Sequence, residues 1–323
     1  MHTKNCEITY DNWRKSMLEA KKNCEENDVA PAEAFHQFSL LFNAKRKLFE
    51  FVNKVENNDE NLRSECKEIY EIIDSIVFEQ ENDKFLNTLY KNTQLYRARR
   101  VRLEAYSGNE GIDILGDKKI SGYDEVNSRE PLLGIPDEGR NNIAGVSYLY
   151  VASNPETACV EVKSQLGDVI SLATFETKEE IKIVDFTYKK DIDKIEYKGM
   201  DINTFFSQLM FQYSKPVGEK GKYKVTQIIS DYLRKTGIDG VAYNSFCCPG
   251  GVNYTFFNSH PKKLEFKESR LLIHKQALHS FWDLNEEQAL YSDNHLIEYD
   301  KKIADEQRKK IMEYIDNVKR KNQ

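Results

Sequence analysis

The amino-acid sequence predicts an α+β protein with helices at both ends of the chain and a mixed sheet between them. Apolar residues from about 10 to 92 recur at helical spacing, as Phe38, Phe42 and Phe49 do. From Gln94 onward, β-branched and aromatic runs do not alternate one for one with helices, which argues against a doubly wound parallel sheet. We expect strands at 95–101, 146–152, 168–177, 181–186, 240–246 and 253–257, and helices at 154–165, 200–212 and 224–236.

These patterns predict three domains, with boundaries at 1–92, 93–268 and 269–323. The first is a bundle of three or four helices without a cluster of His, Cys or paired acids, so packing or partner binding is its expected role. Loop-forming residues dominate 107–142, and so long a loop in a compact domain is usually functional or mobile. Helix is expected again from about 285, where residues 301–323 carry eight basic and four acidic groups. That basic helix is either a solvated face or a docking site for an acidic partner or a nucleic acid.

The composition excludes several classes of protein. The chain has 323 residues, of which 40% are hydrophobic and 31% charged, so wholesale disorder is excluded. A net charge of −6 argues against a dedicated nucleic-acid-binding surface. No apolar run approaches the ~20 residues that span a bilayer, and the first residues lack the apolar stretch of a signal peptide. We therefore expect a cytoplasmic protein that does not associate with membranes. The spacing of its six Cys and six His residues predicts no metal site.

Several polar residues occupy positions that are unusual for a structural role. Arg97 lies inside the first expected strand beside Tyr96, and Arg140 follows a glycine just ahead of the next strand. In that second strand, Tyr148 and Tyr150 alternate with apolar residues, so both tyrosines should point to one face. The common phosphate-binding and nucleophile-elbow motifs are absent from the sequence.

Two further candidates follow along the chain. Asn154 and Pro155 are typical of a helix start, and Glu161 comes about two turns later among small and apolar residues. From spacing alone, Glu161 is either an exposed helix residue or a deliberately placed carboxylate. Ser245 ends a strand ahead of a loop, a position at which serine most often forms a turn.

Taken together and in order, these segments resemble the RES-domain family. The resemblance rests on LYRAR, GRxNxxG, YLYVA, PETAxxE, YxxTQxI, DGVAYNS and GxN, and it extends from about Gln94 to His260. It is closest to members that carry a helical N-terminal extension. None of these motifs is specific by itself, but their common order along half of the chain is a specific signal.

The resemblance implies a fold and an activity. The family fold is similar to that of ADP-ribosyltransferases, and its best-known members are toxins that consume NAD, some by phosphorolysis. By motif position, Arg97 or Arg140 takes the role of the family's arginine, Glu161 that of its glutamate and Ser245 that of its serine. Tyr150 matches the family's tyrosine. The remaining residues expected to bind substrate are Tyr96, Tyr148, Asn142 and Asn253.

The implied reaction is cleavage of the nicotinamide–ribose bond of NAD. A carboxylate such as Glu161 stabilises positive charge on the ribose, and guanidinium groups suit the pyrophosphate. No bound cofactor is expected; NAD is the substrate and inorganic phosphate a potential co-substrate. The Val-Lys-Ser that follows Glu161 departs from the Arg-Pro common in similar members, so the acceptor stays open.

Three alternatives follow from this resemblance. The first is an NAD phosphorylase or glycohydrolase with a toxin-like role, in a toxin–antitoxin or phage-defence setting. The second is an ADP-ribosyltransferase that modifies a macromolecule, and the third is a non-catalytic module that binds a nucleotide or a partner. An antitoxin or regulatory protein is an expected partner, and the chain could form a homo-oligomer.

Overall fold

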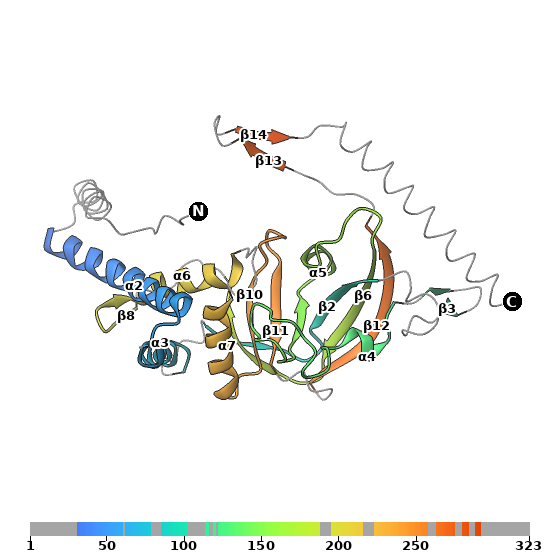
Figure 1. Cartoon of the computed structure of the whole chain (residues 1–323), viewed down its shortest axis with the longest axis horizontal. Coiled ribbons are helices and arrows are strands. Elements are labelled where there is room, and N and C mark those ends of the chain that lie inside the picture. Colours follow the sequence, from blue (N-terminus) through green and yellow to red (C-terminus); the bar gives the residue numbers. More distant parts are fainter. Residues whose placement is uncertain are drawn as a thin grey trace. The chain divides into compact units, whose positions relative to one another are not determined.

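The computed structural model describes residues 31–60, 62–78, 85–101, 114–115, 119–120, 122–187, 195–215, 223–257, 263–274, 280–283 and 288–291. The chain forms two compact units, the first from Met1–Glu81 with Tyr188–Gln212 and the second from Asn82–Thr187 with Tyr213–Gln323. Figure 1 shows the helices of the first unit and the sheet of the second. In the part of the chain that the structure describes, no helix is long and apolar enough to cross a membrane.

The first unit is built on two helices, α2 (Pro31–Asn57) and α3 (Leu62–Val77). Apolar side chains at helical spacing, such as Leu48 and Phe51 of α2 and Ile69 and Ile73 of α3, are fully buried. Among the described residues, the other elements of this unit are the short strands β8 (Glu196–Tyr197) and β9 (Met200–Asp201) and most of the helix α6 (Ile202–Ser214).

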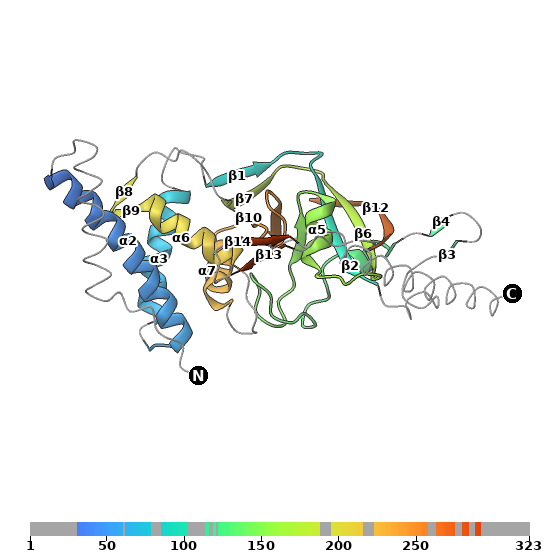
Figure 2. The same ribbon diagram turned by 90° about the horizontal axis from the view of Figure 1, so that it is seen from above.

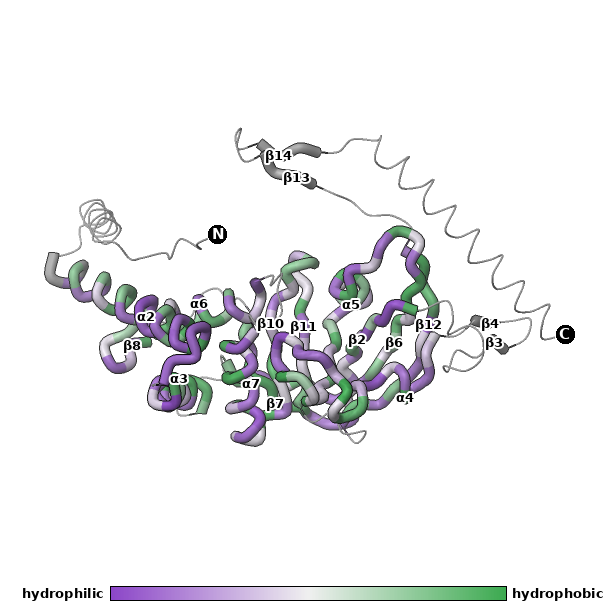
Figure 3. Tube along the Cα trace, in the orientation of Figure 1, coloured by the Kyte–Doolittle hydropathy of each residue, from purple (hydrophilic) through white to green (hydrophobic). Residues whose placement is uncertain are grey.

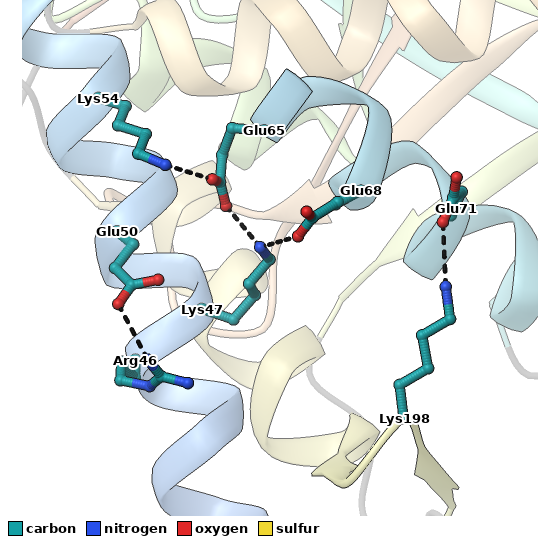
Figure 4. Close-up of polar contacts among 8 residues, drawn as sticks. All are labelled: Arg46, Lys47, Glu50, Lys54, Glu65, Glu68, Glu71 and Lys198. Carbon is teal, nitrogen blue, oxygen red and sulfur yellow. Dashed lines mark hydrogen bonds and ion pairs between the residues drawn. The ribbon is translucent and has the colours of Figure 1, made fainter. Parts of the chain in front are cut away.

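A group of ion pairs joins these elements (Figure 4). Glu65 of α3 is buried between two lysines of α2, at 2.7 Å from Lys47 Nζ and 2.6 Å from Lys54 Nζ. Burial opposes ionisation, but hydrogen bonds from the two lysines lower the pKa of Glu65 below its usual range. Lys198 of the β8–β9 turn pairs with Glu71 of α3 at 3.0 Å. The first unit is therefore held together by apolar packing and by paired charges.

The second unit contains an eight-stranded mixed sheet, seen from two directions in Figures 1 and 2. The parallel pair is β7 with β10, whereas the other neighbours are antiparallel. In sheet order the strands are β1 (Leu86–Leu89), β7 (Ile181–Phe186), β10 (Gly240–Asn244), β11 (Val252–Phe256), β5 (Leu149–Ala152), β2 (Gln94–Arg100), β6 (Val169–Thr177) and β12 (Leu264–Ile273). Two further hairpins are β3 (Ile114–Leu115) with β4 (Lys119–Ile120) and β13 (Ser280–Asp283) with β14 (Gln288–Tyr291).

Buried side chains cover both faces of this sheet. Leu95, Phe175 and Phe256 belong to the larger apolar cluster. A smaller cluster packs the helix α5 (Pro155–Glu161) onto the sheet through Ala158, which contacts residues such as Leu172. In the part of this unit that the structure describes, further helices are α4 (Glu125–Ser128) and α7 (Lys224–Lys235). Hydrophilic and hydrophobic residues alternate along α7 in Figure 3, as in an amphipathic helix that packs one face.

The predicted α+β class is confirmed, and the expected strands and helices between 94 and 257 are present with shifts of a few residues. Two features differ from the prediction. Residues 86–89, expected to be helical, form the edge strand β1, because they pair with β7. Residues 288–291, expected to begin a helical tail, form β14, and the basic helix expected at 301–323 lies outside the described residues.

The two units divide the chain differently from the predicted domains. Residues 188–212 belong to the first unit, although they lie inside the predicted second domain. The strand β12, which the sequence analysis did not single out, pairs with β6 over nearly its whole length.

Candidate active site

A cleft of about 250 Å³ opens in the second unit where the sheet separates. The strands β2 and β5 pair at a single position, Tyr96 with Ala152, so little of their length is joined by the sheet ladder. Small apolar residues of these strands and of α5 form part of the wall. The polar and aromatic residues that line the cleft are Tyr96, Arg97, Tyr150, Glu161, Tyr243 and Asn253.

Local sequence explains how α5 brings Glu161 to this cleft. The side chain of Asn154 caps the helix by accepting a hydrogen bond from the backbone N–H of Thr157 at 2.8 Å, and Pro155 occupies the first turn. Glu161 is the last helical residue, and Lys163 then turns the chain with a φ of 50°. The carboxylate is half-buried and lines the cleft. Of the two alternatives that the sequence leaves open, the structure therefore favours the placed carboxylate.

Two side chains hold this carboxylate by the same oxygen. Ser245 Oγ donates to Glu161 Oε1 at 2.6 Å, and Asn253 Nδ2 donates to the same atom at 2.7 Å. Ser245 Oγ in turn accepts a hydrogen bond from the backbone N–H of Cys248 at 3.0 Å. Hydrogen bonds to a charged group are short and strong, so the orientation of Glu161 is well defined. Ser245 is arranged as a donor to Glu161, and no described contact activates it as a nucleophile.

A glycine allows the loop after Ser245 to approach α5. A Cβ atom on Gly251 would lie 2.2 Å from the Oγ1 atom of Thr157, well inside van der Waals contact. Gly251 precedes β11, which carries Asn253. The GxN motif therefore combines close packing with the placement of one of the two donors to Glu161.

Arg97 brings a positive charge into the cleft from β2. Its Nη1 atom is buried without a hydrogen-bond partner. Burial, together with the neighbouring Arg99, lowers the pKa of Arg97 to about 10, while Glu130 opposes this shift. The guanidinium stays charged at neutral pH, and a buried charged donor without a partner is costly. Arg97 is therefore suited to binding an anion in the cleft.

Arg140 lies behind the cleft wall. Its guanidinium is 5.1 Å from the ring centre of Tyr223 and 5.7 Å from that of Tyr243, and Nη2 donates to the backbone carbonyl of Lys215 at 2.9 Å. Tyr243 lines the cleft, whereas Arg140 does not. Of the two arginines considered for the family's arginine, the structure brings Arg97 to the cleft and engages Arg140 in supporting Tyr243.

The hydroxyl of Tyr150 is fully engaged by the preceding loop. It donates to Asn142 Oδ1 at 2.6 Å and accepts a hydrogen bond from the backbone N–H of Asn141 at 3.1 Å. Burial raises the pKa of Tyr150 well above its ordinary value. Asn142 also donates to the carbonyls of Asp137 and Ile143, both at 3.0 Å, so its side chain is occupied by the protein. Tyr150 thus presents a neutral ring to the cleft, and Asn142 supports it from behind.

The remaining two predicted tyrosines are placed differently. Tyr96 lines the cleft and donates from its hydroxyl to Gln94 Oε1 at 2.9 Å. Tyr148 precedes β5, is buried, and packs against Phe257 at 5.1 Å between ring centres. Tyr148 is not among the residues that line the cleft.

Sequence reasoning missed Tyr243, which lines the cleft and lies 5.7 Å, ring centre to guanidinium, from Arg140. A signal was available, because Tyr243 comes two residues before Ser245 at the end of one strand and should share its face. The polar residues of α7 that hold the loop at 139–142 were also missed as part of the site. They lie far from it in sequence, and only the fold brings them together.

Comparison with known proteins identifies this region. The RES domain family matches residues 122–283. The chain belongs to the RES-domain family. The RES domain includes Arg140, Tyr150, Glu161, Ser245 and Asn253, whereas β2 with Arg97 precedes the matched region.

Other comparisons add little to the family assignment. No curated protein sequence matches the RES-domain chain significantly. Among solved structures, the M. tuberculosis MbcT–MbcA toxin–antitoxin complex is similar at 15% identity and a TM-score of 0.33, covering 58% of this chain and 87% of that one.

Proposed function

We propose that this RES-domain protein degrades NAD by cleaving the bond between nicotinamide and ribose. The observation that carries the proposal is the arrangement in one cleft: Ser245 and Asn253 orient Glu161, and Arg97, whose Nη1 atom is buried without a hydrogen-bond partner, lies in the same wall. A negative group and a positive group in one cleft suit a substrate that carries charge of both signs. NAD has a cationic nicotinamide ring and an anionic pyrophosphate.

Glu161 would stabilise the transition state. As the nicotinamide–ribose bond breaks, nicotinamide leaves with the bonding electron pair, and positive charge develops on the ribose ring. A carboxylate fixed beside the ring stabilises this charge, as in glycoside cleavage. Because Ser245 and Asn253 already orient Glu161, little reorganisation is needed when the charge appears.

Arg97 would bind the pyrophosphate. A guanidinium offers forked donors that match phosphate oxygens, and an unpartnered buried donor gains most from such a partner. The rings of Tyr96, Tyr150 and Tyr243 form the aromatic part of the cleft wall. Aromatic rings of this kind suit stacking against a planar base.

The acceptor decides the product. Water would give ADP-ribose and a proton, and inorganic phosphate would give a phosphorylated ADP-ribose; in each case an acceptor oxygen forms the new bond to the ribose carbon. A macromolecular acceptor would make the protein an ADP-ribosyltransferase. We favour a small acceptor, because the best-known members of the RES-domain family are toxins that consume NAD, some of them by phosphorolysis.

We also propose a toxin-like role with a protein inhibitor. The best-known members of the RES-domain family are toxins, and uncontrolled loss of NAD would harm the cell that makes the enzyme. An antitoxin or regulatory partner that covers the cleft would provide this control. A non-catalytic role would not explain why two hydrogen-bond donors orient Glu161.

The test is NAD consumption by the purified full-length protein, with and without inorganic phosphate, followed by mass spectrometry of the products. Release of free nicotinamide supports the proposal, and a phosphorylated ADP-ribose that forms only with phosphate identifies a phosphorylase. With labelled NAD and a cell extract, label on macromolecules would instead identify a transferase. No loss of NAD in any of these reactions would contradict the proposed activity.

A further inference from the structure

Three polar side chains on α7 are buried, although surface helices normally expose such groups. Thr226, Gln227 and Ser230 have exposed fractions of 2%, 5% and 0%. Buried polar groups require hydrogen-bond partners, so the groups that these side chains contact indicate their role. The sequence motif YxxTQxI contains two of them, and the proposed reaction assigns them no role.

Their partners lie in one turn of the chain, residues 139–142. Gln227 Nε2 donates to the backbone carbonyl of Gly139 at 2.8 Å and is 3.1 Å from that of Asn142. Thr226 donates to the backbone carbonyl of Arg140. Ser230 Oγ donates to the side chain of Asn141 at 3.0 Å. One face of α7 therefore contacts each residue of this turn.

The 139–142 turn also fixes Tyr150 in the cleft wall. The Tyr150 hydroxyl donates to the Asn142 side chain and accepts from the Asn141 backbone. A Cβ atom on Gly139 would lie 2.8 Å from the same hydroxyl, so the turn and the tyrosine are in close contact. Displacement of the turn would remove both hydrogen bonds of Tyr150 at once.

We propose that Gln227 is a positioning residue of the active site, which acts through the 139–142 turn to hold the ring of Tyr150 against the substrate. It does not itself line the cleft. Of the three α7 side chains, that of Gln227 contacts most of the turn, because its single amide group reaches the backbone carbonyls at both ends. For its effect on catalysis, this inference rests on the proposed cleavage of NAD.

The first test measures Tyr150 directly and does not require enzymatic activity. Gln227→Met keeps the length of the side chain but removes the donor. The ionisation of Tyr150 is followed by the ultraviolet absorbance of tyrosinate, as the difference between each protein and its Tyr150→Phe counterpart. Because burial holds the pKa of Tyr150 well above its ordinary value, we expect Tyr150 of the wild type to ionise only far above that value, and Tyr150 of Gln227→Met to ionise at a lower pH. The reason is that the Tyr150 hydroxyl, once released from the turn, becomes hydrated, and water stabilises its ionised form.

The second test is steady-state kinetics with NAD. Loss of one or two buried hydrogen bonds weakens a contact about tenfold, so KM is expected to rise about tenfold in Gln227→Met, while kcat changes less than about threefold. Gln37→Met, the same change in the first unit, is the control and should leave both constants unchanged. A purely structural effect would instead lower the amount of active protein, which reduces apparent kcat and leaves KM unaltered.

The outcomes separate the two proposals. If wild-type protein shows no activity but the Tyr150 ionisation still moves, the positioning role stands and the proposed reaction fails. If wild-type protein is active but neither the ionisation nor KM changes in Gln227→Met, the positioning role is overturned. If Gln227→Met does not fold, Gln227→Asn, which is too short to reach both carbonyls, takes its place with the same two readouts and the same criteria.

Discussion

Replacing Arg97 by methionine should make the protein more stable and at the same time unable to bind an anion. The guanidinium lies in the cleft with Nη1 buried and without a hydrogen-bond partner. A pKa of about 10 corresponds to a cost of about 3 kcal/mol for keeping the charge at this site. That cost already includes the attraction of Glu130. Methionine has a similar length, carries no charge and fills irregular space well.

Part of this gain is offset by lost packing of the guanidinium, so we expect Arg97→Met to stabilise the protein by about 1–2 kcal/mol. For a folded unit of this size, that corresponds to a rise in Tm of about 4 °C. The cost of the charge applies wherever Arg97 is protonated in the folded protein. As pH rises through about 10, the wild type sheds this proton and gains stability relative to the unfolded chain, so the difference between the two proteins should narrow.

The assay is thermal unfolding of both proteins with and without pyrophosphate, which represents the anionic part of NAD. Pyrophosphate should raise the Tm of the wild type and not that of Arg97→Met, because a ligand stabilises only the state that binds it. Arg100→Met is the control: Arg100 is exposed on the same strand and forms one long ion pair, 3.6 Å from Asp168. A lower Tm for Arg97→Met, or an equal response of both proteins to pyrophosphate, would refute this reasoning.

Two further predictions concern the contacts around the carboxylate. Ser245→Ala removes the 2.6 Å hydrogen bond to Glu161, and because such bonds contribute about 1.5–3 kcal/mol, kcat/KM for NAD should fall about 10- to 100-fold. Ser269→Ala, which also loses a 2.6 Å bond but outside the cleft, should remain fully active, and total inactivation of Ser245→Ala would instead indicate a nucleophile. Gly251→Ala should lower the free energy of unfolding, measured by chemical denaturation, by about 1–3 kcal/mol, because the added Cβ atom clashes with Thr157. Adding Thr157→Ala should restore part of this lost stability. An unaffected midpoint in the single variant would contradict the close packing.

Much of the sheet could be predicted from the sequence, because its strands are short runs with a strong pattern. The run at 181–186 is found where it was expected, and so is the helix after Asn154, whose capping residue is explicit in the sequence. The strand at 86–89 could not be predicted in this way. It has four residues, lies at the edge of the sheet, and is specified by its pairing with β7.

The candidate site was predictable to the extent that its residues lie inside motifs. Glu161, Ser245 and Asn253 were singled out, and the structure joins them by two hydrogen bonds. Their mutual contact could not be derived from the sequence, since 92 positions separate Glu161 from Asn253. Of the two tyrosines at 148 and 150, Tyr150 lines the cleft and Tyr148 does not. Tyr148 lies just before β5, which begins at Leu149, so the sequence pattern alone could not place its side chain.

If the oriented carboxylate of Glu161 supports the cleavage of NAD, the release of nicotinamide must depend on this carboxylate. The initial rate of release is compared among the full-length wild type, Glu161→Gln and Glu156→Gln. Glu156 is the matched control, because it lies exposed in the first turn of the same helix. We expect nicotinamide release by the wild type and by Glu156→Gln, and a rate at least about 100-fold lower in a correctly folded Glu161→Gln. Equal rates for all three proteins would contradict this expectation.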